Sequence, residues 1–267
     1  MALKPGVYTA CKKDGTNYYR ASVTYRSKHI SLGSYTTEDQ AYHAYLHAQK
    51  LLDSSQMPED YRSHCILPFD KWIILTNFRD NEVYIRNPIY LRKRYFEYYL
   101  SKDLILKFDI DDLFYYSEHK ISMRGQHLFV ADYGMQVSIA GRYGIRPYAV
   151  QDRDYRFINQ DSTDYRYENI EIINSYYGVT KIKKGQQDQY KAVIHVKSNY
   201  VIGRFNTDTE AAIAYNKAVD CLRKQGIIRN YETNYIDTVS PSVYAELYSG
   251  ITLPKSITSF TSAEHTK

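Results

Sequence analysis

Three groups of residues in this chain have types and spacings that could bind a metal ion. They are Asp109 with Asp111 and Asp112, Asp152 with Asp154, and His43 with His47. Histidines four positions apart share one face of a helix, but this pair lacks the glutamate of the His-Glu-x-x-His zinc motif. Acidic clusters beside turns are usually hydrated or brace the turn. There is also no phosphate-binding glycine-rich loop and no Gly-x-Ser-x-Gly, so we expect no metal and no cofactor.

Lysine and arginine gather in two segments, residues 4–35 and 178–206, each with six cations and a single aspartate. The cations are Lys4, Lys12, Lys13, Arg20, Arg26 and Lys28, and then Lys181, Lys183, Lys184, Lys191, Lys197 and Arg204. Each segment therefore has a net charge of +5. Because the net charge of the whole chain is also +5, the residues outside the two segments have a net charge of 5 − 10 = −5. Neutralising phosphates with such side chains releases condensed counterions. A polyanion, and nucleic acid first, is the expected ligand.

The two basic segments belong to two copies of one sequence unit. The copy that begins GVYTACKKDG at Gly6 returns as GVTKIKKGQQ at Gly178. Matched pairs include Gly6 and Gly178, Tyr19 and Tyr190, Ala21 and Ala192, Gly33 and Gly203, Tyr35 and Phe205, Thr37 and Thr207, Tyr45 and Tyr215, and Ala48 and Ala218. A separation of about 170 residues is far longer than the repeat of a solenoid. The copies are therefore expected to be two domains that flank a third region.

An alternating pattern inside each copy predicts a half-buried strand. In the first copy, Ala21 and Val23 share one face of residues 19–26. The other face holds Arg20, Ser22, Thr24 and Arg26. In the second copy, Ala192 and Ile194 face one way, opposite Lys191, Val193, His195 and Lys197. The polar face is cationic in both copies.

Each copy then changes to helical periodicity. Thr37 with Gln40, and Thr207 with Glu210, have the spacing of a capping box, which begins a helix. The apolar stripes that follow are Ala41, Ala44, Tyr45, Ala48 and Leu52, and Ala211, Ala214, Tyr215, Ala218 and Leu222. Alanine in such a stripe allows a helix to pack closely against a sheet.

The order GV, Y-[RK]-A, [LI]-G-x-[YF]-x-T and A-x-A-Y-x-x-A resembles the Apetala/ethylene-response-factor DNA-binding domain, over about 50 residues in each copy. The resemblance implies a three-stranded antiparallel sheet that lies in the major groove of double-stranded DNA, backed by one helix. The family's contact positions correspond to Gly6, Tyr8, Ala10, Lys12, Ser22, Thr24, His29 and Ser31, and to Gly178, Thr180, Ile182, Lys184, Val193, His195, Asn199 and Val201. Ala10, Ile182 and Val201 replace the arginines and tryptophans typical of the family, so DNA binding is better supported than sequence specificity.

The segment DYRFINQDSTDYRYENIEIIN, residues 154–174, resembles the core of HNH homing endonucleases. The matching residues are Ile158, Asn159, Asp161, Asp164, Arg166, Glu168, Asn169 and Ile170. That family uses one histidine to hold a divalent metal and the next to deprotonate water, but Arg156 and Phe157 occupy these positions and can do neither. The three residues between Asn174 and the second copy cannot form the helix that carries the family's last ligand. We expect a remnant without nuclease activity, in which Arg156 contacts phosphate instead.

Residues 66–176 are expected to be strand-rich. Strands are predicted at Ile73–Thr76, Leu104–Ile110, His127–Val130 and Met135–Ile139. Asn87-Pro88 followed by IYLRKRYFEYYLSK predicts a helix with a cap and proline at its first position. The residues after about Asp237 are rich in Ser, Thr and Pro, which favours partial disorder.

Composition limits the class of protein. The 43% of apolar residues is too high for a disordered chain, yet no run approaches the roughly 20 residues of a membrane span. The start also lacks the apolar core of a signal peptide. We therefore expect a cytoplasmic protein with no membrane partner.

The cysteine and tyrosine content leads to two further expectations. The three widely spaced cysteines are expected to be buried free thiols. The thirty tyrosines could serve in the core or as stacking platforms for bases.

The sequence as a whole predicts an α+β protein in which two modules, each a three-stranded antiparallel sheet plus a helix, flank a mixed, strand-rich central domain. The predicted boundaries are 1–60, 61–176, 177–237 and a tail 238–267. The predicted DNA-binding residues are Tyr8, Lys12, Lys13, Arg20, Thr24, Arg26 and Lys28, then Thr180, Lys183, Lys184, Lys191, His195 and Lys197, together with Arg156. Two alternatives remain open: an active HNH-type nuclease with a reorganised metal site, and a protein that binds and inhibits a nucleic-acid enzyme.

Overall fold

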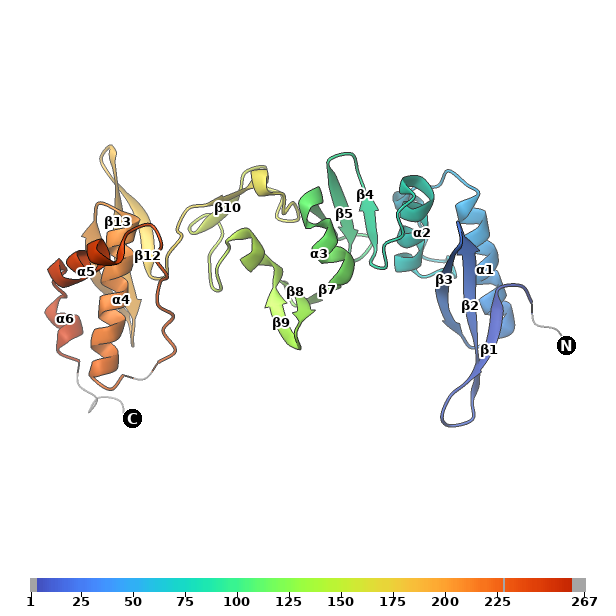
Figure 1. Ribbon diagram of the computed structural model, residues 1–267, viewed down its shortest axis with the longest axis horizontal. Helices are drawn as coiled ribbons and strands as arrows, with labels where there is room; N and C mark the ends of the chain where they lie inside the picture. The colour runs from blue at the N-terminus through green and yellow to red at the C-terminus, as the bar shows by residue number, and fades with distance from the viewer. Residues whose placement is uncertain (1–3, 228, 261–267) are drawn as a thin grey trace. The chain divides into compact units, whose positions relative to one another are not determined.

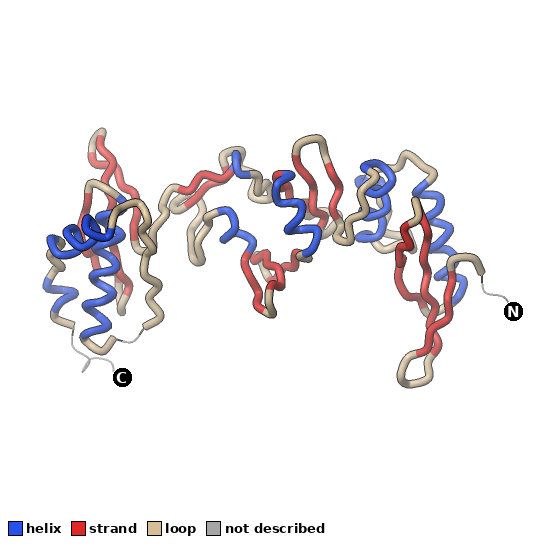
Figure 2. The backbone as a smooth tube through the Cα atoms, viewed as in Figure 1, coloured by secondary structure: helices blue, strands red, loops and turns tan. Residues whose placement is uncertain are grey.

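Small antiparallel sheets and short helices make up the chain, which confirms the predicted α+β class (Figures 1 and 2). The structure is a computed structural model that describes residues 4–227 and 229–260. The chain divides into two units: Met1–Ile139 with Asn159–Asn169, and Ala140–Ile158 with Ile170–Lys267. One predicted module falls in each unit, while the four-part division of the chain stays a prediction. Among the described helices, none has the length and apolar character needed to cross a bilayer.

Each repeat forms three strands and a helix. The first module comprises β1 (Val7–Cys11), β2 (Asn17–Tyr25), β3 (Lys28–Tyr35) and α1 (Glu38–Leu52). The second comprises β12 (Val179–Lys184), β13 (Gln187–His195), β14 (Asn199–Phe205) and α4 (Asp208–Lys224). Both sheets are antiparallel with the middle strand second in sequence, and in each the helix lies along one face (Figure 1).

Threonine side chains begin both helices, as predicted. Thr207 Oγ1 accepts from the backbone N–H of Glu210 at 3.1 Å, and the Glu210 carboxylate accepts from the Thr207 N–H, which completes a capping box. Thr37 Oγ1 likewise accepts from the Gln40 N–H at 3.2 Å. However, Gln40 Oε1 accepts from the Thr36 hydroxyl rather than from the backbone, so the first predicted box is only half formed. A charged carboxylate is the stronger acceptor for a free N–H, and only the second copy has one.

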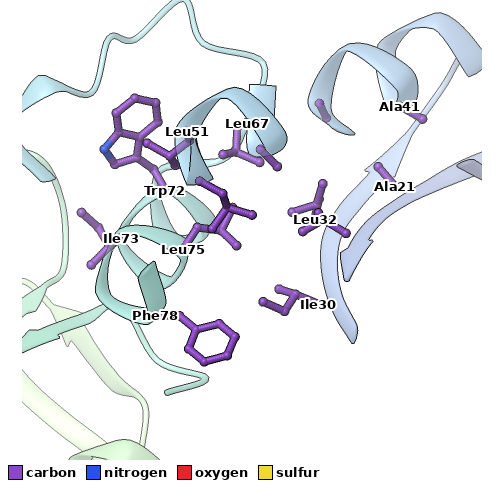
Figure 3. Packing of buried hydrophobic residues seen from close by; sticks show 14 of the residues in the cluster. Ala21, Ile30, Leu32, Ala41, Leu51, Leu67, Trp72, Ile73, Leu75 and Phe78 are labelled. Atoms are coloured by element: carbon purple, nitrogen blue, oxygen red, sulfur yellow. The ribbon is translucent and has the colours of Figure 1, made fainter. Parts of the chain in front are cut away.

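The alanine stripes are buried against their sheets, which confirms the predicted helix faces. Ala41, Ala44 and Ala48 have no exposed surface, and Ala211, Ala214 and Ala218 match them in the second module. Figure 3 shows Ala21 and Leu32 of the first sheet beside Ala41 of α1. Because alanine extends only one carbon from the backbone, helix and sheet can pack at short range.

The first module shares its core with a second helix, α2 (Phe69–Asn81), so that Leu51 of α1 packs with Trp72 and Leu75 (Figure 3). The predicted strand Ile73–Thr76 is wrong, since these residues lie in the middle of α2. A short apolar run does not distinguish a buried helix from a buried strand. Here α2 is covered on nearly every side, from Trp72 to Phe78, so it lacks an amphipathic pattern.

The predicted helix after Pro88 is also wrong, since this segment forms a β-hairpin. Strands β4 (Ile89–Leu91), β5 (Tyr95–Tyr99) and β6 (Ile105–Asp109) make one antiparallel sheet. Asn87, predicted to cap its own helix, instead donates to the carbonyls of Tyr116 and Ser117 at the end of α3 (Leu113–Glu118). Consecutive residues from Phe96 to Tyr99 are buried, so no alternating pattern marked the strand. Aromatic residues favour strands.

The other predicted central strands are confirmed. They are β6, β8 (His127–Asp132) and β9 (Met135–Ser138), and β7 (Ile121–Arg124) completes the sheet β7-β8-β9. Buried rings of Phe96, Phe108 and Tyr116 fill the space beside β5 and β6, with Phe108 and Tyr116 stacked at 4.3 Å between centroids. Tyr98 and Tyr99 are buried as well, so several of the chain's many tyrosines are core residues. The remaining strands, β10 (Tyr155–Phe157) and β11 (Ile170–Ile172), form a hairpin in the second unit.

The tail is ordered where it is described, so the predicted partial disorder is wrong for residues 238–260. Helices α5 (Pro241–Gly250) and α6 (Lys255–Thr258) pack against α4, and Ile257 is fully buried. Residues 261–267 lie outside the described residues.

All three cysteines are free, as expected. However, Cys11 is exposed and Cys65 and Cys221 are only partly covered, which corrects the prediction that the three thiols are buried.

Candidate nucleic-acid interface

A glycine fixes the start of the first strand in both modules. Gly6 has φ +72°, and its carbonyl accepts from the Ser22 N–H at 2.9 Å. Gly178 has φ +69°, and its carbonyl accepts from the Val193 N–H at 2.7 Å. Such φ values are costly for residues with a Cβ. The two sheets therefore present equivalent positions in the same register.

Strand register assigns the side chains of the first module to two faces. Val7 and Ala21 are register partners and are buried toward α1, so Tyr8 and its partner Arg20 point to the opposite side, here called the outer face. One extra residue, Leu32, lies in β3 where the register shifts, which keeps the apolar side chains of both strands inward. The outer face consists of Tyr8, Ala10, Tyr18, Arg20, Ser22, Thr24, His29, Ser31 and Ser34.

Tyrosine rings contact two side chains of this face, Arg20 and His29. Arg20 Nη2 donates to the Tyr18 hydroxyl at 2.7 Å, and its guanidinium lies 5.4 Å from the centre of that ring. Tyr8, with 53% of its surface exposed, meets the His29 ring edge to face at 6.4 Å. Ser22 lies on the same face but is only 5% exposed, so it offers little surface to a ligand.

Lys12 and Lys13 lie in the turn between β1 and β2, and both are exposed. The Lys12 N–H donates to the Thr16 carbonyl, and Asp14 Oδ1 accepts from the Thr16 N–H, which holds this turn. Lys4, by contrast, is paired with Asp39 at the start of α1. The turn therefore presents two cations beyond the end of the sheet.

Arg26 does not lie on the strand face where the alternating pattern placed it, because β2 ends at Tyr25. Arg26 and Ser27 have φ of +45° and +63°, which forms the tight turn into β3. Arg26 Nη1 lies 2.7 Å from the Glu82 carboxylate, and Lys28 Nζ lies 4.8 Å from the centre of the Tyr84 ring. Part of the predicted cationic face is thus engaged with the segment after α2.

The second module presents an equivalent outer face. It consists of Thr180, Ile182, Lys184, Gln187, Gln189, Lys191, Val193, His195, Asn199, Val201 and Arg204. His195 Nδ1 and Asn199 Oδ1 are 3.0 Å apart across the two strands, and Lys191 is the register partner of Arg204. Lys183 is exposed near the β12–β13 turn but points to the opposite face, as the register partner of Asp188, and Lys197 lies in the β13–β14 turn.

Neither outer face includes an aspartate or a glutamate among the described residues. Asp188, the acidic residue of the second sheet region, points to the other face and pairs with Lys181 at 2.8 Å. The positive charge of each face is therefore not offset within that face.

Arg156 and Phe157, which the resemblance to HNH endonucleases would align with catalytic histidines, lie on β10. Arg156 is exposed and pairs with its register partner Glu171 at 2.7 Å, while Phe157 is 5% exposed. No described group of three or more His, Cys, Asp or Glu side chains is arranged to hold a metal ion. The charge of Arg156 is thus partly offset by a neighbouring carboxylate before any ligand binds.

The acidic residues of the same segment brace the loop 159–169. Asp164 has no exposed surface, accepts from Arg166 Nε and Nη2 at 2.8 and 2.6 Å, and accepts from Asn159 Nδ2 at 2.9 Å. Burial alone would raise the pKa of Asp164, but these hydrogen bonds outweigh it and the pKa is lowered. Asp161 accepts from Thr163 and pairs with Lys107 at 3.1 Å. Both carboxylates therefore stabilise the conformation of the loop 159–169 through hydrogen bonds and ion pairs.

The other groups considered as metal ligands have protein partners too. Asp154 is 5% exposed and binds Arg153 at 2.6 Å, and Asp109 Oδ2 accepts from the Tyr167 N–H. His47 Nδ1 lies 3.4 Å from the Cys65 thiol. These contacts agree with a bracing role.

Two cations stand out only in the structure. Arg204 joins the outer face as the register partner of Lys191, because the register shift at Ile202 turns it outward. Strict alternation from Asn199 would have placed it on the other face. Arg146 lies beside the start of the second sheet, outside both repeats, and nothing in its spacing marked it.

Compared with family models, with curated proteins and with solved structures, the chain matches none of them.

Proposed function

We propose that this chain is a double-stranded DNA-binding protein that lays the outer face of each sheet in the major groove. The observation that carries the proposal is the pair of equivalent faces that hold cations and hydroxyls but no carboxylate. Lys and Arg near phosphates release counterions, which supplies affinity for any DNA sequence. Two such faces on one chain suit an extended or two-part DNA site.

Sequence selectivity is modest in this proposal. Bidentate arginine to guanine is the commonest specific contact, and only Arg20 and Arg204 stand on the outer faces. The first of these is already bonded to Tyr18. The centre of each face is filled by short or apolar side chains such as Ser22 and Val193. We therefore assign most of the free energy of DNA binding to contacts with phosphates. The proposed role of the chain is that of a regulator or an accessory protein of a phage or other mobile element.

Loss of nuclease activity is part of the proposal. It is supported by Arg156 and Phe157 at the two histidine positions and by the hydrogen-bonded state of Asp161 and Asp164. Supercoiled plasmid incubated with the purified chain and Mg²⁺ or Mn²⁺ is expected to stay intact. Cleavage that disappears in Asp161→Asn or Asp164→Asn would instead establish the nuclease alternative.

DNA binding is tested by fluorescence anisotropy with a labelled 30-base-pair duplex at several salt concentrations. The variant Lys12→Glu with Lys184→Glu should weaken binding more than tenfold and lower the slope of log K against log salt by about two. The matched control, Lys50→Glu with Lys224→Glu, reverses exposed charges near the ends of α1 and α4. Affinity that does not depend on salt, or equal losses in both variants, would contradict the groove model and favour a protein partner.

A further inference from the structure

The two modules differ at one end of their outer faces. Tyr8 and His29 of the first module correspond by register to Thr180 and Asn199 of the second. In the first module the two rings meet at 6.4 Å and fill this place. In the second the shorter side chains leave a cavity of about 340 Å³.

Residues from outside the repeat form one side of this open cavity. Its lining includes Arg146, Arg153 and Tyr177 from the preceding segment, and Thr180, His195 and Asn199 from the sheet. All of them belong to the second unit.

Arg146 brings a positive charge to the cavity, where the Asp154 carboxylate interacts with it electrostatically. Its guanidinium lies 4.6 Å from the centre of the Tyr177 ring, and Nη2 donates to the Asn174 carbonyl at 3.0 Å. It forms no ion pair with a described carboxylate. Burial lowers the pKa of this guanidinium, although it remains charged at any physiological pH. The ring and the carbonyl fix the plane of the guanidinium and leave further N–H donors for a ligand.

The other polar groups of the lining add donors more than acceptors. Asp154 is the acidic residue there, and its oxygens accept from Arg153, from the Val150 N–H and from Asn174. His195 Nδ1 is directed to Asn199 Oδ1, which leaves the Asn199 amide N–H₂ and the Thr180 hydroxyl as donors. A donor-rich cavity with a fixed guanidinium fits a tetrahedral oxyanion.

We infer that this cavity binds one phosphate of the DNA backbone, with Arg146 as its principal ligand. The inference rests on the proposed function and names an anchor that the repeats themselves do not contain. It makes the two modules unequal: the second is fixed to the backbone at one end of its sheet, whereas the first offers an aromatic and imidazole surface at the same place. A phosphate contact of this kind sets orientation and register on the duplex rather than sequence preference.

The test compares three variants of the full chain in the same anisotropy assay. Arg146→Gln should weaken binding about tenfold on every duplex and lower the salt slope by about one. Thr180→Tyr, which places the first module's residue in the cavity without changing charge, should weaken binding similarly. Lys224→Gln removes one exposed cation at the end of α4 and should change affinity less than twofold.

A second measurement separates the cavity from DNA binding as such. The ring proton signals of His195 in the NMR spectrum should shift when inorganic phosphate is added to the wild-type chain, and should not shift in Arg146→Gln. Phosphate-dependent shifts without any DNA affinity would retain the cavity and overturn the proposed function. DNA affinity that Arg146→Gln and Thr180→Tyr leave unchanged would overturn the phosphate site and retain DNA binding.

Discussion

The ring of Tyr45 packs directly over Gly6, so closely that a Cβ on this glycine would lie 2.2 Å from the ring atom Cδ2. The same contact recurs between Tyr215 and Gly178. It ties the first strand of each sheet to the helix behind it. The same tyrosine–glycine contact thus occurs in both modules, where it helps to hold the first strand, and with it the outer face, in place.

Gly6→Ala should destabilise the first unit by about 3 kcal/mol, because the new Cβ adds a steric overlap to a strained positive φ. Gly15→Ala is the matched control, with φ +85° but no neighbour within 4 Å, and should cost about 1 kcal/mol. The single tryptophan, Trp72, lies on α2 in the core that this helix shares with the first module, so its fluorescence during urea unfolding reports the first unit. Equal losses in the two variants would show that the packing against Tyr45 contributes nothing.

The loop 159–169 should lose stability in acid because of Asp164. Its pKa is lowered in the folded chain, so the stabilisation is fully present above the ordinary aspartate value of about 4 and is lost as pH falls through the lowered value. Asp164→Asn should cost about 3 kcal/mol at pH 6, since it leaves Arg166 without its buried partner, and this difference should shrink below pH 4.

Glu168→Gln is the control for the loop, because this exposed carboxylate also meets Arg166 and should be worth less than 1 kcal/mol. Urea unfolding followed by near-ultraviolet circular dichroism of tyrosine at pH 6, 4 and 2.5 measures both variants. A gap between wild type and Asp164→Asn that stays constant down to pH 2.5 would rule out this linkage.

Arg20 and Arg26 should contribute unequally to DNA binding, although the sequence pattern gave them the same role. Arg20 stands on the outer face, whereas Arg26 is bonded to Glu82 at the β2–β3 turn. Arg20→Ala is expected to weaken binding about tenfold and Arg26→Ala less than threefold, measured by anisotropy at 100 mM salt. If Arg26→Ala has the larger effect, the β2–β3 turn rather than the outer face contacts the DNA.

The elements predicted correctly are those in which apolar residues recur at the spacing of a single type of secondary structure. Ala21 and Val23 alternate because one sheet face is buried, and Ala41, Ala44 and Ala48 follow the turn of a helix. The prediction failed where burial on all sides removed the period, as in α2 around Ile74.

The candidate site was predictable to a similar degree. Lys12, Lys184 and Lys191 follow from the repeat and its charge. Neither the contact of Arg26 with Glu82 nor the place of Arg146 could be read from spacing, because each depends on segments that fold back from outside the repeat.

Lys217 should be needed for the docking of the tail on the second module. Its Nζ donates to the carbonyls of Tyr248 and Ile251 at 2.6 and 2.7 Å, where α5 ends and its carbonyls lack helical partners. Lys217→Met should leave these groups unsatisfied and increase hydrogen exchange in α5 and α6 at least tenfold, while β12–β14 stay protected. Lys224→Met, at an exposed position on the same helix, should leave exchange unchanged. Unaltered exchange in both variants would mean that apolar contacts of Ile257 and its neighbours hold the tail without the ammonium group.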